Sequence, residues 1–129
     1  MLKISDYFDL INLHKALMEA KFNESPNNFD IIRSPIVSKI ANHVIDAIIE
    51  CDVPDNIPNS KEGWDKWRLV EDENRREIGC VQNNIIRTTD WKRWGKKKKI
   101  EYLEIVFSPL IPSKRIIDDL LLFGDKHWN

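Results

Sequence analysis

The sequence predicts an α+β fold, in which two amphipathic helices near the N-terminus and one C-terminal helix pack on a small antiparallel sheet. Apolar residues recur at helical spacing before residue 50 and again after residue 113. Residues 77–82 and 85–89 are rich in β-branched side chains, and residues 100–107 alternate as a strand does. An all-α fold is the alternative, because Ile100, Leu103 and Phe107 also share one helical face.

The first expected helix begins at Ser5, whose hydroxyl can accept hydrogen bonds from the free backbone amides of the first turn. Asp6 and Asp9 also favour a helix start, because carboxylates interact well with the positive end of the helix dipole. The apolar side chains lie largely on one face, and the helix is expected to end near residues 21–22. A loop over residues 23–28 follows, since this stretch is rich in Asn and contains a proline.

The second expected helix has the clearest pattern in the chain. Ser34 is its N-cap, and Pro35 takes the first helical position, where a missing amide does no harm. Ile and Val residues then repeat at helical spacing up to Ile49, and polar residues occupy the opposite face. Two prolines stiffen the acidic loop over residues 52–59, which ends this helix.

The middle of the chain is expected to form the sheet. Ser60 can cap a short helix through Trp64 and Trp67, although residues 67–70 are equally compatible with a strand. A charged turn or helical end at 71–76 precedes the strands expected over 77–82 and 85–89. The strand expected over 100–107 ends at Ser108-Pro109. The last helix is expected to begin at Ser113 and to end at Gly124, a favourable C-terminal capping residue.

Length and hydropathy indicate one cytoplasmic domain spanning residues 1–129. A chain of 129 residues has the size of a typical single domain. Its longest apolar runs are far shorter than the roughly 20 residues that a membrane-spanning helix needs. The first residues also lack the basic stretch followed by an apolar stretch of a signal peptide. We therefore expect a cytoplasmic protein.

The residues that could carry catalysis or bind a metal are scattered. The four glycines are isolated, which excludes a phosphate-binding loop, and no two histidines have the spacing of metal ligands. His43 and Asp46 lie one helical turn apart, but a metal site needs three or four ligands. Cys51 and Cys80 form no CxxC motif and are expected to be free thiols. We predict no cofactor and no catalytic residue; a small enzyme whose site is assembled from distant residues such as His43, Cys51 and Cys80 is an alternative.

The charge of the chain is unevenly distributed. Residues 1–60 contain five Lys or Arg and nine Asp or Glu, whereas residues 91–100 contain six Lys or Arg and no acidic residue. Four acidic side chains cluster at the end of the second helix and in the loop that follows: Asp46, Glu50, Asp52 and Asp55. Such a cluster can attract a basic protein partner, and it can equally be a solvated helix face.

Two aromatic segments are candidates for binding. Trp64 and Trp67 would share one face of a helix, and tryptophan is a frequent anchor at protein interfaces, although it is just as common in a core. The second segment is basic as well as aromatic and could hold a nucleic acid, with lysines on the phosphates and indoles stacked on bases. The competing interpretation is a solvated loop whose indoles pack on the core. Its residues are Trp91, Lys92, Arg93, Trp94, Lys96, Lys97, Lys98 and Lys99.

In length, composition and patterning the chain resembles the immunity proteins of bacterial contact-dependent inhibition and polymorphic toxin systems. The resemblance rests on the 129 residues, the Ile- and Val-rich helix that starts at Ser34-Pro35, the acidic residues between 46 and 55, and the abundance of Asn, Ile and Lys. It implies a protein that binds and neutralises a toxin domain, often a nuclease. The expected interface consists of Asp46, Glu50, Asp52, Asp55, Trp64 and Trp67. Nucleic-acid binding through residues 91–99 is the second prediction.

Overall fold

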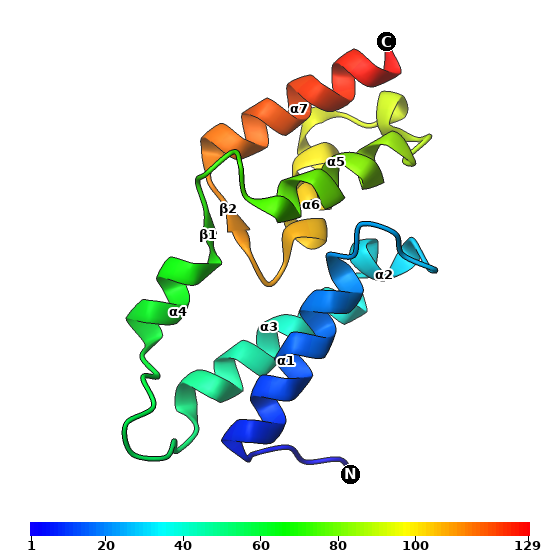
Figure 1. Ribbon diagram of the computed structural model, residues 1–129. Coiled ribbons are helices and arrows are strands. Elements are labelled where there is room, and N and C mark those ends of the chain that lie inside the picture. Colours follow the sequence, from blue (N-terminus) through cyan, green and yellow to red (C-terminus); the bar gives the residue numbers. More distant parts are fainter.

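A computed structural model describes all 129 residues and shows a mostly helical protein (Figure 1). The prediction of an α+β fold with an antiparallel sheet is wrong, because the only strands are two residues long and pair in parallel. None of the helices combines the length and the apolar character needed to cross a membrane. The elements are α1 (Tyr7–Lys21), α2 (Asp30–Arg33), α3 (Pro35–Glu50), α4 (Lys61–Arg68), β1 (Leu69–Val70), α5 (Arg76–Ile86), the 3-10 helix η1 (Trp91–Arg93), α6 (Lys96–Phe107), β2 (Ile111–Pro112) and α7 (Lys114–Trp128).

The expected strands of the middle region are helices because their apolar residues also repeat at helical spacing. Ile78, Val81 and Ile85 in α5 are three or four residues apart and all buried, so they form one face of the helix against the core. Leu103 and Phe107 in α6 are likewise four apart and fully buried. Burial on a helical face therefore outweighs the β propensity of the branched side chains, which is a context-dependent preference.

Most of the expected helix starts are confirmed. Ser34, Ser60 and Ser113 each accept a hydrogen bond from a backbone amide of the first turn that follows. The cap of α1 differs from the prediction, because Asp6 rather than Ser5 accepts the amides of the first turn. The predicted end of the last helix at Gly124 is also wrong. That glycine is buried inside α7, where the ring of Trp91 packs directly against its backbone.

The helices form two groups joined by α4 and β1 (Figure 1). In one group α1 packs along α3, around a small cluster of Leu10, Val44 and Ile48. In the other group α5, α6 and α7 surround the main core, which also receives Phe22 and Ile32 from the N-terminal part of the chain. β1 pairs with β2 beside this core. Helix α4, which directly precedes β1, contacts α3 of the other group.

A buried lysine connects the two groups of helices by hydrogen bonds. Lys21, at the end of α1, is only 2% exposed. Its ammonium group donates hydrogen bonds to Ser38 Oγ at 2.7 Å, to the carbonyl oxygen of Ile105 at 3.0 Å and to that of Ser108. Burial lowers the pKa of Lys21 to about 7. The ammonium therefore connects α1 to α3 and to the end of α6, and its protonation is linked to folding.

Candidate partner-binding site

Helix α4 presents two tryptophans to α1. The helix begins where Ser60 Oγ accepts the backbone amide of Gly63 at 3.0 Å. Trp64 and Trp67 then fall one turn apart on the face turned toward α1, with ring centroids 5.6 Å apart in an edge-to-face arrangement. Both side chains are half-buried, so each packs on the protein and still reaches the surface. The shared aromatic face predicted from their spacing is therefore present.

His14 of α1 completes this aromatic cluster. Its ring centroid lies 5.3 Å from that of Trp64 and 5.1 Å from that of Trp67, edge to face in both cases. The residue is 9% exposed, and neither of its ring nitrogens makes a hydrogen bond within the protein. Burial, together with the positive charges of Arg68 and Lys15, lowers the pKa of His14. The imidazole is therefore neutral at pH 7, with one donor and one acceptor.

A pocket of about 410 Å³ opens beside these three rings. This volume lies in the range of sites that hold small molecules or single side chains of a partner. Its walls are mostly apolar, and the one charged side chain that lines it is Lys15. The lining residues are Ile11, His14, Lys15, Pro58, Asn59, Ser60, Gly63, Trp64 and Trp67.

The walls of the pocket are fixed by hydrogen bonds behind them. The indole N–H of Trp64 donates to Asn59 Oδ1 at 2.8 Å, and Asn59 Nδ2 in turn donates to the carbonyl of Ile48 at 2.8 Å. On the other side, the Arg75 guanidinium lies 5.5 Å from the centre of the Trp67 ring and donates to the Trp67 carbonyl at 2.8 Å. Side chains held in this way lose little freedom when a ligand binds, which favours affinity.

The acidic residues predicted to contact a partner do not form one patch. Asp46 is turned toward α4, where its carboxylate lies 3.7 Å from Arg68. Glu50 and Asp52 line a separate surface hollow of about 550 Å³, together with Asp6 at the start of α1. Asp55 is exposed on the loop before α4. The structure thus brings Glu50 and Asp52 together, and it assigns Asp46 to an ion pair within the protein.

The basic segment forms η1 and the first turn of α6. Trp91 is fully buried and donates its indole N–H to Asp125 at 3.0 Å, so its ring cannot stack on a base. Trp94 is half-buried and packs on Tyr102 at 5.3 Å between ring centroids. Lys99 forms an ion pair with Asp125 at 2.8 Å. The cations that remain exposed are Lys92, Arg93, Lys96, Lys97 and Lys98.

The acidic and basic segments lie far apart. In Figure 1 the loop that follows α3 is at the lower left, whereas η1 is at the upper right. The charge asymmetry of the sequence is therefore also an asymmetry in space. The aromatic pocket belongs to the acidic end, because residues 58–60 of that loop line it.

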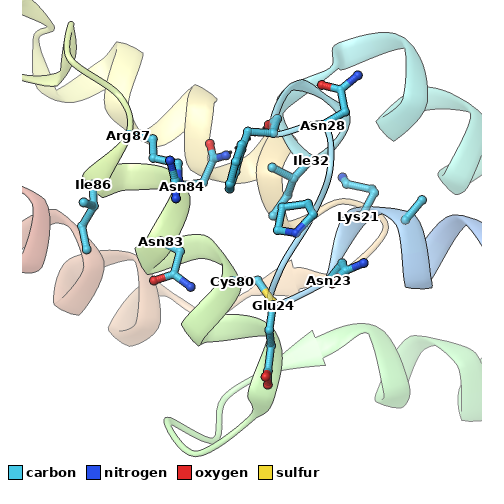
Figure 2. Close-up of a pocket in the computed structure, with 13 residues that line it drawn as sticks. Lys21, Asn23, Glu24, Asn28, Ile32, Cys80, Asn83, Asn84, Ile86 and Arg87 are labelled. Carbon is cyan, nitrogen blue, oxygen red and sulfur yellow. Dashed lines mark hydrogen bonds between the residues drawn. The ribbon is translucent and has the colours of Figure 1, made fainter.

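A second pocket, of about 420 Å³, lies where the end of α1 and the loop after it meet α2 and α5 (Figure 2). Its buried polar groups already have partners within the protein. Asn84 accepts the hydroxyl of Tyr102 and donates to the carbonyl of Phe29 at 3.4 Å. Arg87 stacks over the Phe29 ring at 3.7 Å, and the ammonium of Lys21 is engaged by Ser38. The buried polar groups of this pocket are therefore engaged within the protein, and the exposed side chains of Glu24 and Asn83 also line it.

The residues considered for an enzyme site are not brought together. Cys80 is buried, and burial raises the pKa of its thiol, which disfavours the nucleophilic thiolate at neutral pH. The Cys51 thiol donates to the carbonyl of Ile48 at 3.2 Å. His43 is exposed, and Asp46, one helical turn further along α3, pairs with Arg68. No three His, Cys, Asp or Glu side chains are grouped so that they could hold a metal ion.

Sequence reasoning did not identify His14 or Asn59 as part of the site. A signal for His14 existed, because it lies four residues after the buried Leu10 and seven before the buried Lys21, on the inner face of α1. Nothing in the sequence pointed to Asn59, whose role depends on the fold of the loop. Comparisons with protein-family models, with curated proteins and with solved structures find no match for the chain.

Proposed function

We propose that this chain is a small cytoplasmic binding protein that neutralises a protein partner, in the manner of an immunity protein acting on a toxin domain. The observation that carries the proposal is the preformed pocket of His14, Trp64 and Trp67 at the acidic end of the molecule. Tryptophans that are packed against their neighbours and still reach the surface are the side chains that most often dominate binding energy at interfaces.

The charge of the surrounding surface favours a basic partner. Glu50, Asp52 and Asp55 are exposed at the end of α3 and in the loop that leads to residues 58–60 of the pocket, and residues 1–60 carry an excess of negative charge. Such a surface increases the rate at which a positively charged partner associates. A nuclease domain, whose active-site cleft is basic, is a partner of this kind.

The experiment is affinity capture followed by an activity assay. The protein is immobilised, a lysate of its source cell is passed over it, and the retained material is identified at low and at high salt. We expect one stoichiometric protein that stays bound at high salt and loses its own activity, for example nuclease activity, when the chain is added. Retention of nucleic acid alone, released steeply as salt rises, would contradict the proposal.

Nucleic-acid binding through residues 91–99 is the second candidate. In its favour, Lys96, Lys97 and Lys98 are exposed in the first turn of α6, where positive charge opposes the helix dipole. Against it, the burial of Trp91 removes one of the two expected stacking platforms. Replacing the three lysines by Gln should abolish any nucleic-acid binding if this candidate is correct, and should leave protein capture unchanged if the first proposal is correct.

A further inference from the structure

The imidazole of His14 is one of the polar groups that line a mostly apolar pocket. Its exposed fraction is 9%, yet its donor and its acceptor have no partner among the surrounding residues, whose nearest rings are those of Trp64 and Trp67. By contrast, the indole N–H of Trp64 is already bound to Asn59. The His14 nitrogens still reach solvent, because the one fully buried side-chain nitrogen or oxygen without a partner is Arg33 Nε. A ligand that fills the pocket would displace this solvent, so it would have to supply the imidazole with a hydrogen-bond partner.

We propose that this pocket receives the phenol ring of a tyrosine from the protein partner, with the tyrosine hydroxyl hydrogen-bonded to His14. That the tyrosine belongs to a protein partner rests on the proposed function. The chemistry of the pocket itself does not depend on the identity of that partner. A hydroxyl group both donates and accepts, so it can pair with either neutral tautomer of the imidazole.

The shape and composition of the pocket favour an aromatic ring over other groups. Trp64 and Trp67 meet edge to face, and a third ring can join them in the offset or edge-on geometries that aromatic groups prefer. A purely apolar side chain would bury the His14 nitrogens without a partner, which is unfavourable. A cationic side chain would meet the positive charges of Lys15, which lines the pocket, and of Arg68, which acts on His14.

The test uses p-cresol, the isolated tyrosine side chain, and toluene, which has the same ring without the hydroxyl. Each is titrated into the whole protein, and binding is followed by nuclear magnetic resonance from the His14 ring protons and the Trp64 and Trp67 indole signals. We expect p-cresol to bind at least fivefold more tightly than toluene, the factor that one typical net hydrogen bond supplies. Equal affinities, tighter binding of toluene, or no shift of these signals with p-cresol would overturn the proposal.

A variant pair locates the hydrogen bond. His14→Phe keeps an aromatic ring at the position and removes both nitrogens, so the preference for p-cresol should disappear and toluene should bind at least as well. Trp94→Leu, at the opposite end of the molecule, should keep the wild-type preference. If His14→Phe folds and still prefers p-cresol, His14 is not the group that recognises the hydroxyl. If it does not fold, the comparison of the two ligands in the wild-type protein decides the question.

This test also separates the pocket from the proposed function. If p-cresol binds with the expected preference and the lysate yields no protein partner, the pocket is correct and the neutralising function is wrong. If a protein partner is captured and p-cresol does not bind at His14, the function stands and the tyrosine proposal fails.

Discussion

The packing of Trp91 on α7 predicts opposite effects for two glycine-to-alanine substitutions. A Cβ atom added at Gly124 would lie 2.5 Å from two ring carbons of Trp91 and 2.8 Å from its indole nitrogen. The ring cannot easily move away, because it is fully buried and its N–H is bound to Asp125, which also pairs with Lys99. Gly124→Ala must therefore displace either the indole or the backbone of α7.

The magnitude follows from two opposing contributions. Overpacking a core costs about 1–3 kcal/mol, and the contact at 2.5 Å places this site at the upper end of that range. Alanine is the better helix former by about 1 kcal/mol, which offsets part of the cost. We expect Gly124→Ala to lower the free energy of unfolding by about 2 kcal/mol.

Gly79→Ala in α5 is the matched control. A Cβ atom added there meets nothing within 4 Å, and the position is exposed. Only the helix propensity changes, so the free energy of unfolding should rise by about 0.5–1 kcal/mol. Urea unfolding followed by circular dichroism measures both variants. A Gly124→Ala variant as stable as the wild type would refute the packing of Trp91 on α7.

Three further predictions concern stability. The pKa of Lys21 is about 7 in the folded protein and about 10.4 in an unfolded chain. Between these pH values the unfolded chain binds one more proton than the folded protein. The free energy of unfolding should therefore rise with pH, by up to about 1.4 kcal/mol per pH unit from pH 7.5 to 8.5. Lys21→Met should lose this slope; an unchanged slope would assign it to another group. Tyr102→Phe should lower the free energy of unfolding by about 1–3 kcal/mol, because it removes the hydroxyl that Asn84 Oδ1 accepts at a buried position; an unchanged midpoint in urea would contradict this. Lys97→Glu should raise the free energy of unfolding by about 0.3–1 kcal/mol at low salt, since it places a negative charge in the first turn of α6, and a lower thermal midpoint would show that the dipole is not the dominant effect.

Features that depend on residues close together in the sequence were predictable. Ser34, Ser60 and Ser113 cap helices through amides only three residues away, and the Ile and Val pattern after Pro35 fits only one kind of element. Short β-branched runs were not predictable, because residues 77–89 satisfy both a strand and a helical pattern until the core selects one. Gly124 was misassigned because its role is to make room for Trp91, which is 33 residues away in the sequence.

In the candidate site too, contacts between residues close in the sequence were predictable and contacts between distant residues were not. The shared face of Trp64 and Trp67 follows from their spacing, and the structure has it. Their contact with His14 joins α4 to α1 across 50 residues, and no local pattern specifies such a pairing. The acidic residues are close together in the sequence, but they occupy different faces of the structure. Asp46 on α3 pairs with Arg68, whereas Glu50 and Asp52 line a hollow with Asp6.

The most direct test of the account compares partner capture by Trp64→Leu and Trp94→Leu. Each variant replaces a half-buried tryptophan by a smaller apolar side chain. Trp64 lies in the pocket at the acidic end, and Trp94 lies in the basic segment. We expect the protein retained by the wild type at high salt to be lost, or weakened at least tenfold in affinity, with Trp64→Leu, and to be retained by Trp94→Leu. Retention by Trp64→Leu together with loss by Trp94→Leu would contradict the central claim and would move the binding surface to residues 91–99.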